Sequence, residues 1–209
     1  MIPGIPSDAV LAGLQADAYA VAPAGRAVDA GPDRAVLTCL PGLCVATIRG
    51  TVNPRGWWSD FQIAPRVARS HPCLGECEAG FLDGAEALYA VLRPLLDGTP
   101  LLIQGHSRGA PIAAMLAGLL ICDCRTPVRC VCWEKPWGNG PQLRALLAES
   151  GMPGVEYWHG DDPVPLVPAV PWLVMSNFPI RHFGRWTVDP FASHLMAGIV
   201  ADATELAAA

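Results

Sequence analysis

Residues 101–121 read LLIQGHSRGAPIAAMLAGLLI, and this stretch decides the fold of the chain. Residues 101–103 are apolar and have the length of a strand covered on both faces, while residues 110–121 form an alanine-rich run typical of a buried helix. Between them, Gly105-His106-Ser107-Arg108-Gly109 predicts a sharp turn that presents Ser107. A side chain two residues before or after this serine would collide where the strand and the helix cross. Glycine at both positions removes that collision.

The composition indicates one globular domain. The 209 residues are enough for one sizeable core, and 52% hydrophobic against 16% charged residues predicts a folded chain. We therefore expect residues 1–209 to form a single domain. The net charge of -5 gives no electrostatic reason to expect a nucleic acid partner.

We identify no membrane-spanning segment and no export signal in the sequence. The most apolar segments, residues 110–121 and 164–175, are too short to span a bilayer, so we expect no transmembrane segment. Residues 1–14 lack a basic region followed by an apolar one, so no secretory signal is read. By default, this predicts a cytoplasmic location.

Outside the central stretch, the periodicity predicts strands that alternate with helices. Helices are expected over residues 7–19, 80–96 and 141–150 and from His194 to about residue 206, and strands over residues 35–40, 43–49, 128–133 and 155–159. Residues 25–32 are expected to be a loop, residues 62–79 a long surface connection and residues 172–188 a hairpin-like region. This order predicts an α/β fold, a mostly parallel central sheet with helices on both faces.

Eight cysteines are many for this length. A Pro41-Gly42 turn would set Cys39 and Cys44 opposite each other on paired strands. In a chain read without a secretory signal, cysteines serve mostly as small core residues, so we expect eight free thiols. Disulfides and a zinc site are the alternatives, although the cysteine spacings match no standard zinc pattern.

Ser107 needs a base to take its proton and an acid to orient that base. In hydrolases built on this turn, the order along the chain is serine, acid, histidine. The candidates in that order are Asp161 or Asp162 and then His182 or His194. Each follows a predicted strand or precedes a predicted helix, where side chains converge at the carboxyl edge of a parallel sheet.

The chain resembles the class 3 lipases of the α/β-hydrolase superfamily. Four blocks carry the resemblance: Arg49-Gly50-Thr51 with residues 57–61, Gly80-Phe81-Leu82, the Gly105–Gly109 turn, and Asp162-Pro163-Val164-Pro165 with Pro168. It covers roughly residues 35 to 200. The sequence departs from the family pattern at Arg108, where a leucine is usual, and at Glu78, near where a histidine is usual.

The resemblance implies a triad of Ser107, Asp162 and His194. It also implies that Thr51 and the backbone N–H of Arg108 form the oxyanion hole and that residues 57–79 occupy the lid region. Trp57 and Trp58 are then either rim aromatics or the wall of an acyl pocket.

These features predict a serine hydrolase that cleaves carboxylic esters, lipase- or esterase-like, through an acyl-enzyme. The expected partner is a small-molecule ester or lipid, with no cofactor and no metal. A thioesterase, an amidase or an acyltransferase with the same triad is the alternative within enzymes, and an inactive hydrolase-fold binding module is the alternative outside them. The charge of Arg108 and the broken pattern of residues 62–79 favour polar, water-soluble esters over an oil phase.

Overall fold

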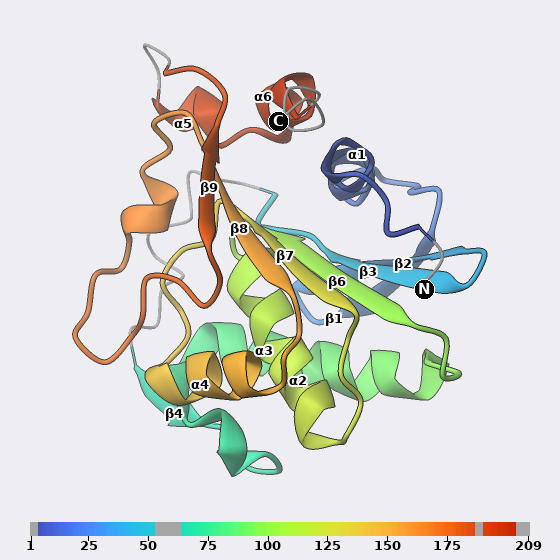
Figure 1. Cartoon of the computed structure of the whole chain (residues 1–209), viewed down its shortest axis with the longest axis vertical. Coiled ribbons are helices and arrows are strands. Elements are labelled where there is room, and N and C mark those ends of the chain that lie inside the picture. The colour runs from blue at the N-terminus through green and yellow to red at the C-terminus, as the bar shows by residue number, and fades with distance from the viewer. Residues whose placement is uncertain (1–3, 53–63, 187–189, 204–209) are drawn as a thin grey trace.

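A seven-stranded sheet forms the centre of the computed structural model, which describes residues 4–52, 64–186 and 190–203 (Figure 1). In sheet order the strands are β1 (Arg26–Ala30), β2 (Asp33–Leu40), β3 (Leu43–Ile48), β6 (Leu101–His106), β7 (Arg129–Trp133), β8 (Gly154–His159) and β9 (Ile180–Phe183). The first two pairings are antiparallel, and the four from β3 to β9 are parallel. The predicted α/β class with a mostly parallel sheet is therefore confirmed.

Helices cover both faces of this sheet (Figure 1). One face carries α2 (Ala79–Leu92), α3 (Gly109–Cys122) and α4 (Pro141–Glu149), and the other carries α1 (Asp8–Asp17) and α6 (Met196–Asp202). The remaining elements are the short helix α5 (Pro190–Ser193), the 3-10 turns η2 (Pro72–Leu74), η3 (Arg93–Leu95) and η4 (Val164–Leu166), and a small sheet of β4 (Pro65–Val67) and β5 (Glu76–Glu78). Within the described ranges, no helix has the length and apolarity to cross a membrane.

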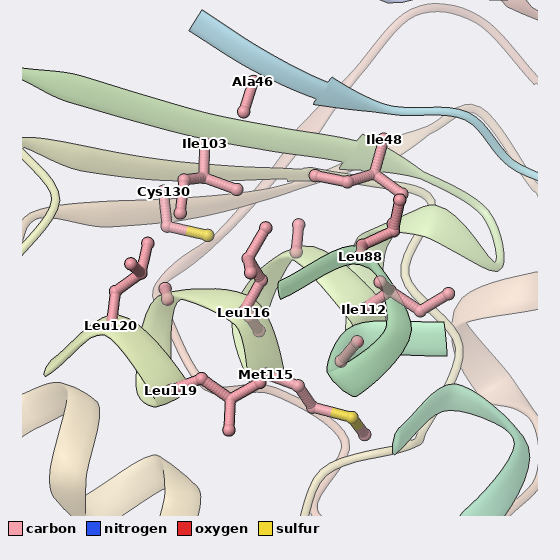
Figure 2. Close-up of a cluster of buried hydrophobic side chains, with 14 of the residues drawn as sticks. Ala46, Ile48, Leu88, Ile103, Ile112, Met115, Leu116, Leu119, Leu120 and Cys130 are labelled. Carbon is pink, nitrogen blue, oxygen red and sulfur yellow. The ribbon is translucent and has the colours of Figure 1, made fainter. Parts of the chain in front are cut away.

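The alternation of side chains along β6 builds two cores. Ile103 faces α3, while Leu102 belongs to the cluster under α1 and α6. Figure 2 shows the larger core, where side chains of β3, β6 and β7 meet α2 and α3: Ala46, Ile48, Ile103, Cys130, Leu88, Ile112 and Leu116. Because every residue of α3 except the last two is buried, the strand, turn and helix of the central stretch form the middle of the molecule.

Three sequence expectations about secondary structure were wrong. Residues 26–30, expected as loop, form edge strand β1, whose mostly exposed side chains hide the apolar alternation of a strand. Residues 65–78, expected as an irregular connection, contain β4, η2 and β5. The expected hairpin over residues 172–188 is absent from its described part, 172–186, where β9 is the one strand and runs parallel to β8.

The expectation of eight free thiols was also wrong. Cys39 and Cys44 face each other in register across the turn between β2 and β3, as the Pro41-Gly42 spacing predicts, and they form a disulfide. A second disulfide joins Cys73 to Cys122 and so ties η2 to the end of α3. These two cysteines are 49 residues apart, and only the tertiary packing brings them together.

The structure predicts four free thiols when the unfolded protein is titrated without reductant, namely Cys77, Cys124, Cys130 and Cys132. In the native protein, one thiol should react quickly, because Cys124 alone of these four is exposed and burial raises the pKa of Cys77 to about 11. Ellman titration of native and unfolded protein measures both numbers. Eight thiols in the unfolded, unreduced protein would show that neither disulfide forms.

Candidate active site

Ser107 follows β6 in a left-handed backbone conformation, with φ of 54°. A Cβ on Gly105 would lie 2.1 Å from the carbonyl oxygen of Gly109, and a Cβ on Gly109 would lie 2.4 Å from that of Ile48. Both distances are far shorter than a van der Waals contact, so glycine is required two residues before and two residues after the serine. The sharp turn predicted from the sequence is present, and it sets Ser107 at the carboxyl edge of the parallel strands.

Asp162 and His194 lie at the same edge of the sheet. Asp162 follows β8 and is fully buried, and its Oδ2 lies 2.6 Å from Nδ1 of His194, which stands between α5 and α6. The Asp162 Oδ1 accepts a hydrogen bond from the backbone N–H of Val164. Both carboxylate oxygens are thus occupied, and the imidazole is held by the acid as a triad requires.

The other two candidates, Asp161 and His182, have other partners. Asp161 accepts a hydrogen bond from Ser193 Oγ. The His182 side chain is exposed on β9 and stacks on Trp158 at 4.7 Å between ring centroids. The geometry therefore favours Asp162 and His194 among the candidates that the sequence left open.

The loop after β3 lies against the serine. A Cβ on Gly50 would come within 2.7 Å of the His106 carbonyl oxygen and 3.0 Å of the Ser107 Cβ, so the backbone approaches the turn closely. Thr51, half-buried, is the next residue along this loop, and Arg108 is the N-cap residue of α3. Thr51 and Arg108 therefore come from two segments next to the serine turn, and the oxyanion hole that the resemblance implies for them stays a prediction.

His106 connects the parts of the site. Its Nδ1 lies 2.6 Å from the hydroxyl of Tyr19, and its Nε2 lies 3.0 Å from the carbonyl oxygen of His194. Burial, together with the neighbouring His194, lowers the pKa of His106 well below its ordinary value, so the ring is neutral. Since Nε2 must donate to a carbonyl, Nδ1 accepts from Tyr19, whose oxygen accepts from the Gly50 N–H. These hydrogen bonds fix the positions of the Gly50 loop and the His194 backbone relative to the serine turn.

Arg108 does not present a free charge to the site, which corrects the reason given for polar substrates. Its guanidinium forms a two-point ion pair with the buried Asp33, at 2.9 and 3.2 Å, and donates to the carbonyl oxygen of Gly80. The unpaired cation nearby is Arg49. Among the described residues it has no ion-pair partner, and its Nε is buried without a hydrogen-bond acceptor.

A hollow of about 600 Å³ lies beside the Gly50 loop. Its polar walls come from Asp33, Arg49, Thr51, Asp83 and Arg108, and the rest is mostly glycine and alanine. Thr51 and Arg108 thus border both the serine turn and an open space that a substrate can enter.

The described part of the expected lid, residues 64–79, is not a free helix. It consists of β4, η2 and β5, and the disulfide to Cys122 and the ion pairs from Arg66 to Asp83 and Glu86 fasten it to α3 and α2. Trp57 and Trp58 lie outside the described residues, so the two interpretations of these aromatics stay predictions.

Three residues at the site were not found from the sequence. They are Tyr19 at the end of the α1 region, Glu134 directly after β7, and His159 at the end of β8, which bonds to the Ser193 carbonyl oxygen and to Asp202. Glu134 and His159 had a readable signal, because they lie at the carboxyl ends of β7 and β8, and these parallel strands end at the same sheet edge as β6. Tyr19 had none.

Comparison with known proteins matches residues 45–172 to the family model described as lipase (class 3). This match covers more than half of the chain and includes the Gly50 loop, the serine turn and Asp162. The chain belongs to the class 3 lipase family. The match to the family model ends before His194, so the proposal of His194 as the base rests on the geometry above.

One relative of this class 3 lipase chain is a fungal lipase. The chain is 25% identical over 135 residues to the secreted mono- and diacylglycerol lipase 1 of Fusarium solani. The aligned region covers 60% of this chain and 39% of that protein. The chain thus spans about two fifths of the length of this relative. Since this relative is secreted, the expectation of a cytoplasmic location is contradicted. The two disulfides agree with this correction, because such bonds persist in oxidising surroundings.

Solved lipase structures share the fold. The triacylglyceride lipase of Rhizomucor miehei superposes with a TM-score of 0.64 at 17% identity, covering 87% of this chain and 79% of that one. The lipase of Rhizopus microsporus var. chinensis gives a TM-score of 0.62 at 18% identity, covering 77% and 67%. At these identities the likeness shows the α/β-hydrolase fold.

Proposed function

We propose that this chain is a single-domain serine hydrolase that cleaves carboxylic esters through an acyl-enzyme on Ser107. One observation carries the proposal: a serine held at positive φ on the sharp turn shares the sheet edge with a buried aspartate and histidine 2.6 Å apart. A buried polar pair and a strained serine each cost free energy, and both are typical of functional sites.

The proposed reaction follows from the positions of these groups. His194 takes the proton of the Ser107 hydroxyl as the oxygen attacks the ester carbonyl, and Asp162 stabilises the imidazolium that forms. Thr51 and the Arg108 N–H donate hydrogen bonds to the oxyanion. The alcohol leaves with the proton from His194, and water then releases the acid by the same steps in reverse order.

A fluorophosphonate probe followed by intact mass measurement tests this function. The wild-type protein should gain one adduct, Ser107→Ala should gain none, and Ser150→Ala should label like the wild type, since its hydroxyl donates to the Leu147 carbonyl at the end of α4. An unlabelled wild-type protein would identify an inactive binding module instead. A matched set of oxygen ester, thioester and amide substrates then separates the esterase from its enzymatic alternatives.

The oxyanion hole gives a second test. Thr51→Val keeps the side-chain shape and the backbone N–H but removes the hydroxyl donor, so kcat should fall by about ten- to a thousand-fold with little change in KM. Steady-state kinetics on a soluble ester measure both constants. An unchanged kcat would remove the Thr51 hydroxyl from the mechanism.

For the substrate, acyl esters of glycerol and smaller polar esters are the candidates, and the structure favours soluble ones. The segment 64–79 is fastened at Arg66 and Cys73, and Arg49, which has no ion-pair partner among the described residues, lines the hollow, so neither offers an apolar surface to an oil phase. Short-chain esters should show simple saturation. With tributyrin, the rate should not jump when the substrate passes its solubility limit, and a sharp rise there with a preference for long chains would restore a true lipase.

A further inference from the structure

Glu134 occupies on β7 the position that Ser107 occupies on β6. His106 pairs with Trp133 in register, so the residues that follow the two strands lie side by side. The Ser107 N–H donates to the Trp133 carbonyl oxygen, and the Glu134 N–H donates to that of Tyr157 on the next strand. Both residues have positive φ, 54° for Ser107 and 50° for Glu134.

This backbone conformation is unfavourable for a residue other than glycine, and it persists where the surroundings enforce it. In the described ranges, Ser107, Glu134 and Cys124 are the residues other than glycine with positive φ. Cys124 is exposed just past the end of α3 that lies away from Ser107, while Glu134 is fully buried at the sheet edge that carries Ser107. The strain at Glu134 therefore points to a role in the site.

One oxygen of the Glu134 carboxyl group accepts a hydrogen bond, and the other has no hydrogen-bond partner. Its Oε1 accepts from the backbone N–H of His159, while its Oε2 is buried without a partner that donates to it. The carboxylate of Asp162, itself fully buried, is the neighbouring acid: the Asp162 N–H donates to the carbonyl oxygen of His159, whose own N–H bonds to Glu134, and the charge of Asp162 acts on the Glu134 carboxyl. Two neighbouring carboxylates away from water cannot both be ionised at ordinary cost.

The two carboxyl groups differ in the donors that face them. Asp162 has two, the Val164 N–H and the His194 Nδ1–H, whereas Glu134 has one, so the shared proton belongs on Glu134. Burial, and then the charge of Asp162, raise the pKa of Glu134 well above its ordinary value. A proton on Glu134 turns the unpartnered Oε2 into a donor, and Asp162 is the acceptor beside it.

We propose that Glu134 is a positioning residue of the triad, whose carboxylic acid donates a hydrogen bond to the Asp162 carboxylate and holds it in the orientation that His194 needs. This rests on the proposed function, because it takes Asp162 and His194 as triad partners. The third donor disperses the charge of Asp162 and keeps it from accepting the proton of the imidazolium.

Other charged groups around this pair are accounted for. The His159 imidazole bonds to the Ser193 carbonyl oxygen and to Asp202, and Asp161 bonds to Ser193. The ammonium of Lys135 donates to the Met175 carbonyl oxygen and lies 3.7 Å from Glu156. The pH dependence at the pair is therefore set by Glu134, Asp162 and His194.

The pH profiles of kcat/KM of two Glu134 variants test whether Glu134 acts as a neutral hydrogen-bond donor. Glu134→Gln keeps a neutral donor, so the midpoint of the acid limb should stay within about 0.3 pH units of the wild type. Glu134→Gly relieves the backbone strain and deletes the donor. The charge of Asp162 is then less dispersed, the imidazole keeps its proton to higher pH, and the midpoint should rise by about 0.5–1 pH unit with a fall in kcat of about tenfold.

Matched controls separate strain relief and loss of a buried carboxyl from the proposed role. Cys124→Gly relieves the same kind of backbone strain away from the site, and Glu156→Gln removes another buried carboxyl on β8. Neither should move the acid limb. A downward shift in both Glu134 variants would mean that Glu134 is ionised, and no shift in Glu134→Gly beyond the controls would make it a space-filling residue. Either result overturns the proposal.

A spectroscopic measurement keeps the test independent of turnover. The proton that His194 donates to Asp162 should give a downfield ¹H NMR resonance, identified by its loss in His194→Asn. It should move in Glu134→Gly and stay close to its wild-type position in Glu134→Gln. If the resonance behaves so in a protein that cleaves no ester, the positioning role stands and the proposed function fails. A resonance that is identical in all variants overturns the positioning role alone.

Discussion

His194→Ala should remove nearly all ester hydrolysis, by about four orders of magnitude in kcat, while His182→Ala should leave most of it. His194 is buried and bonded to Asp162, so its loss removes the base and leaves only the oxyanion donors and substrate binding. His182 is exposed on β9, where its ring packs on Trp158.

Steady-state kinetics on a soluble ester measure this difference, and thermal unfolding of both variants shows whether each is folded. The two histidines are twelve residues apart in the same C-terminal region, so each serves as the control for the other. If His182→Ala were the inactive variant, the assignment of the base would have to be exchanged.

Gly105→Ala should destabilise the fold by more than about 3 kcal/mol. Its new Cβ would lie 2.1 Å from the Gly109 carbonyl oxygen and 2.9 Å from the Ala110 nitrogen. These atoms belong to the backbone of the turn and of a helix buried on all sides, so no side-chain rotation can relieve the overlap. The strand and the helix would have to separate, and the serine would lose its position with them.

Gly13→Ala is the matched control for this substitution. Gly13 lies in the middle of α1, is exposed, and has no atom within 4 Å of its ideal Cβ position. Alanine should stabilise this helix by about 0.5–1 kcal/mol. Urea denaturation of the two variants and the wild type measures both effects. Equal stability of Gly105→Ala and the wild type would contradict the steric argument for the turn.

The sequence was most informative where local chemistry alone determines structure. The glycine pair around Ser107, the apolar strand before it and the apolar helix after it predicted the central element and the parallel sheet. The bounds of β3, β7, β8 and α4 were each predicted to within one residue at either end. Asp162 and His194 were chosen through the family resemblance, and the structure brings these two together and places Asp161 and His182 elsewhere.

The missed features depend on contacts between segments far apart in the chain. β1 is an edge strand whose mostly exposed residues show no apolar alternation. The cysteines at 73 and 122 meet only because η2 packs on α3. Tyr19 reaches His106 from a different layer of the fold, and although the place of Glu134 after a predicted strand was readable, its burial next to the turn of Asp162 depends on how β7 and β8 pair. No local pattern carries such information.

The bond between Cys73 and Cys122 also acts on the unfolded chain. It closes a loop of 49 residues that contains α2, β6, the serine turn and most of α3. A cross-link of this span removes conformational freedom from the denatured ensemble equivalent to about 4 kcal/mol in the chain-entropy model. Reduction of this bond breaks no described contact of Ser107, Asp162 or His194 but restores the conformational freedom of the denatured chain, so we expect a reducing solution to lower the population of folded molecules rather than the turnover of each one.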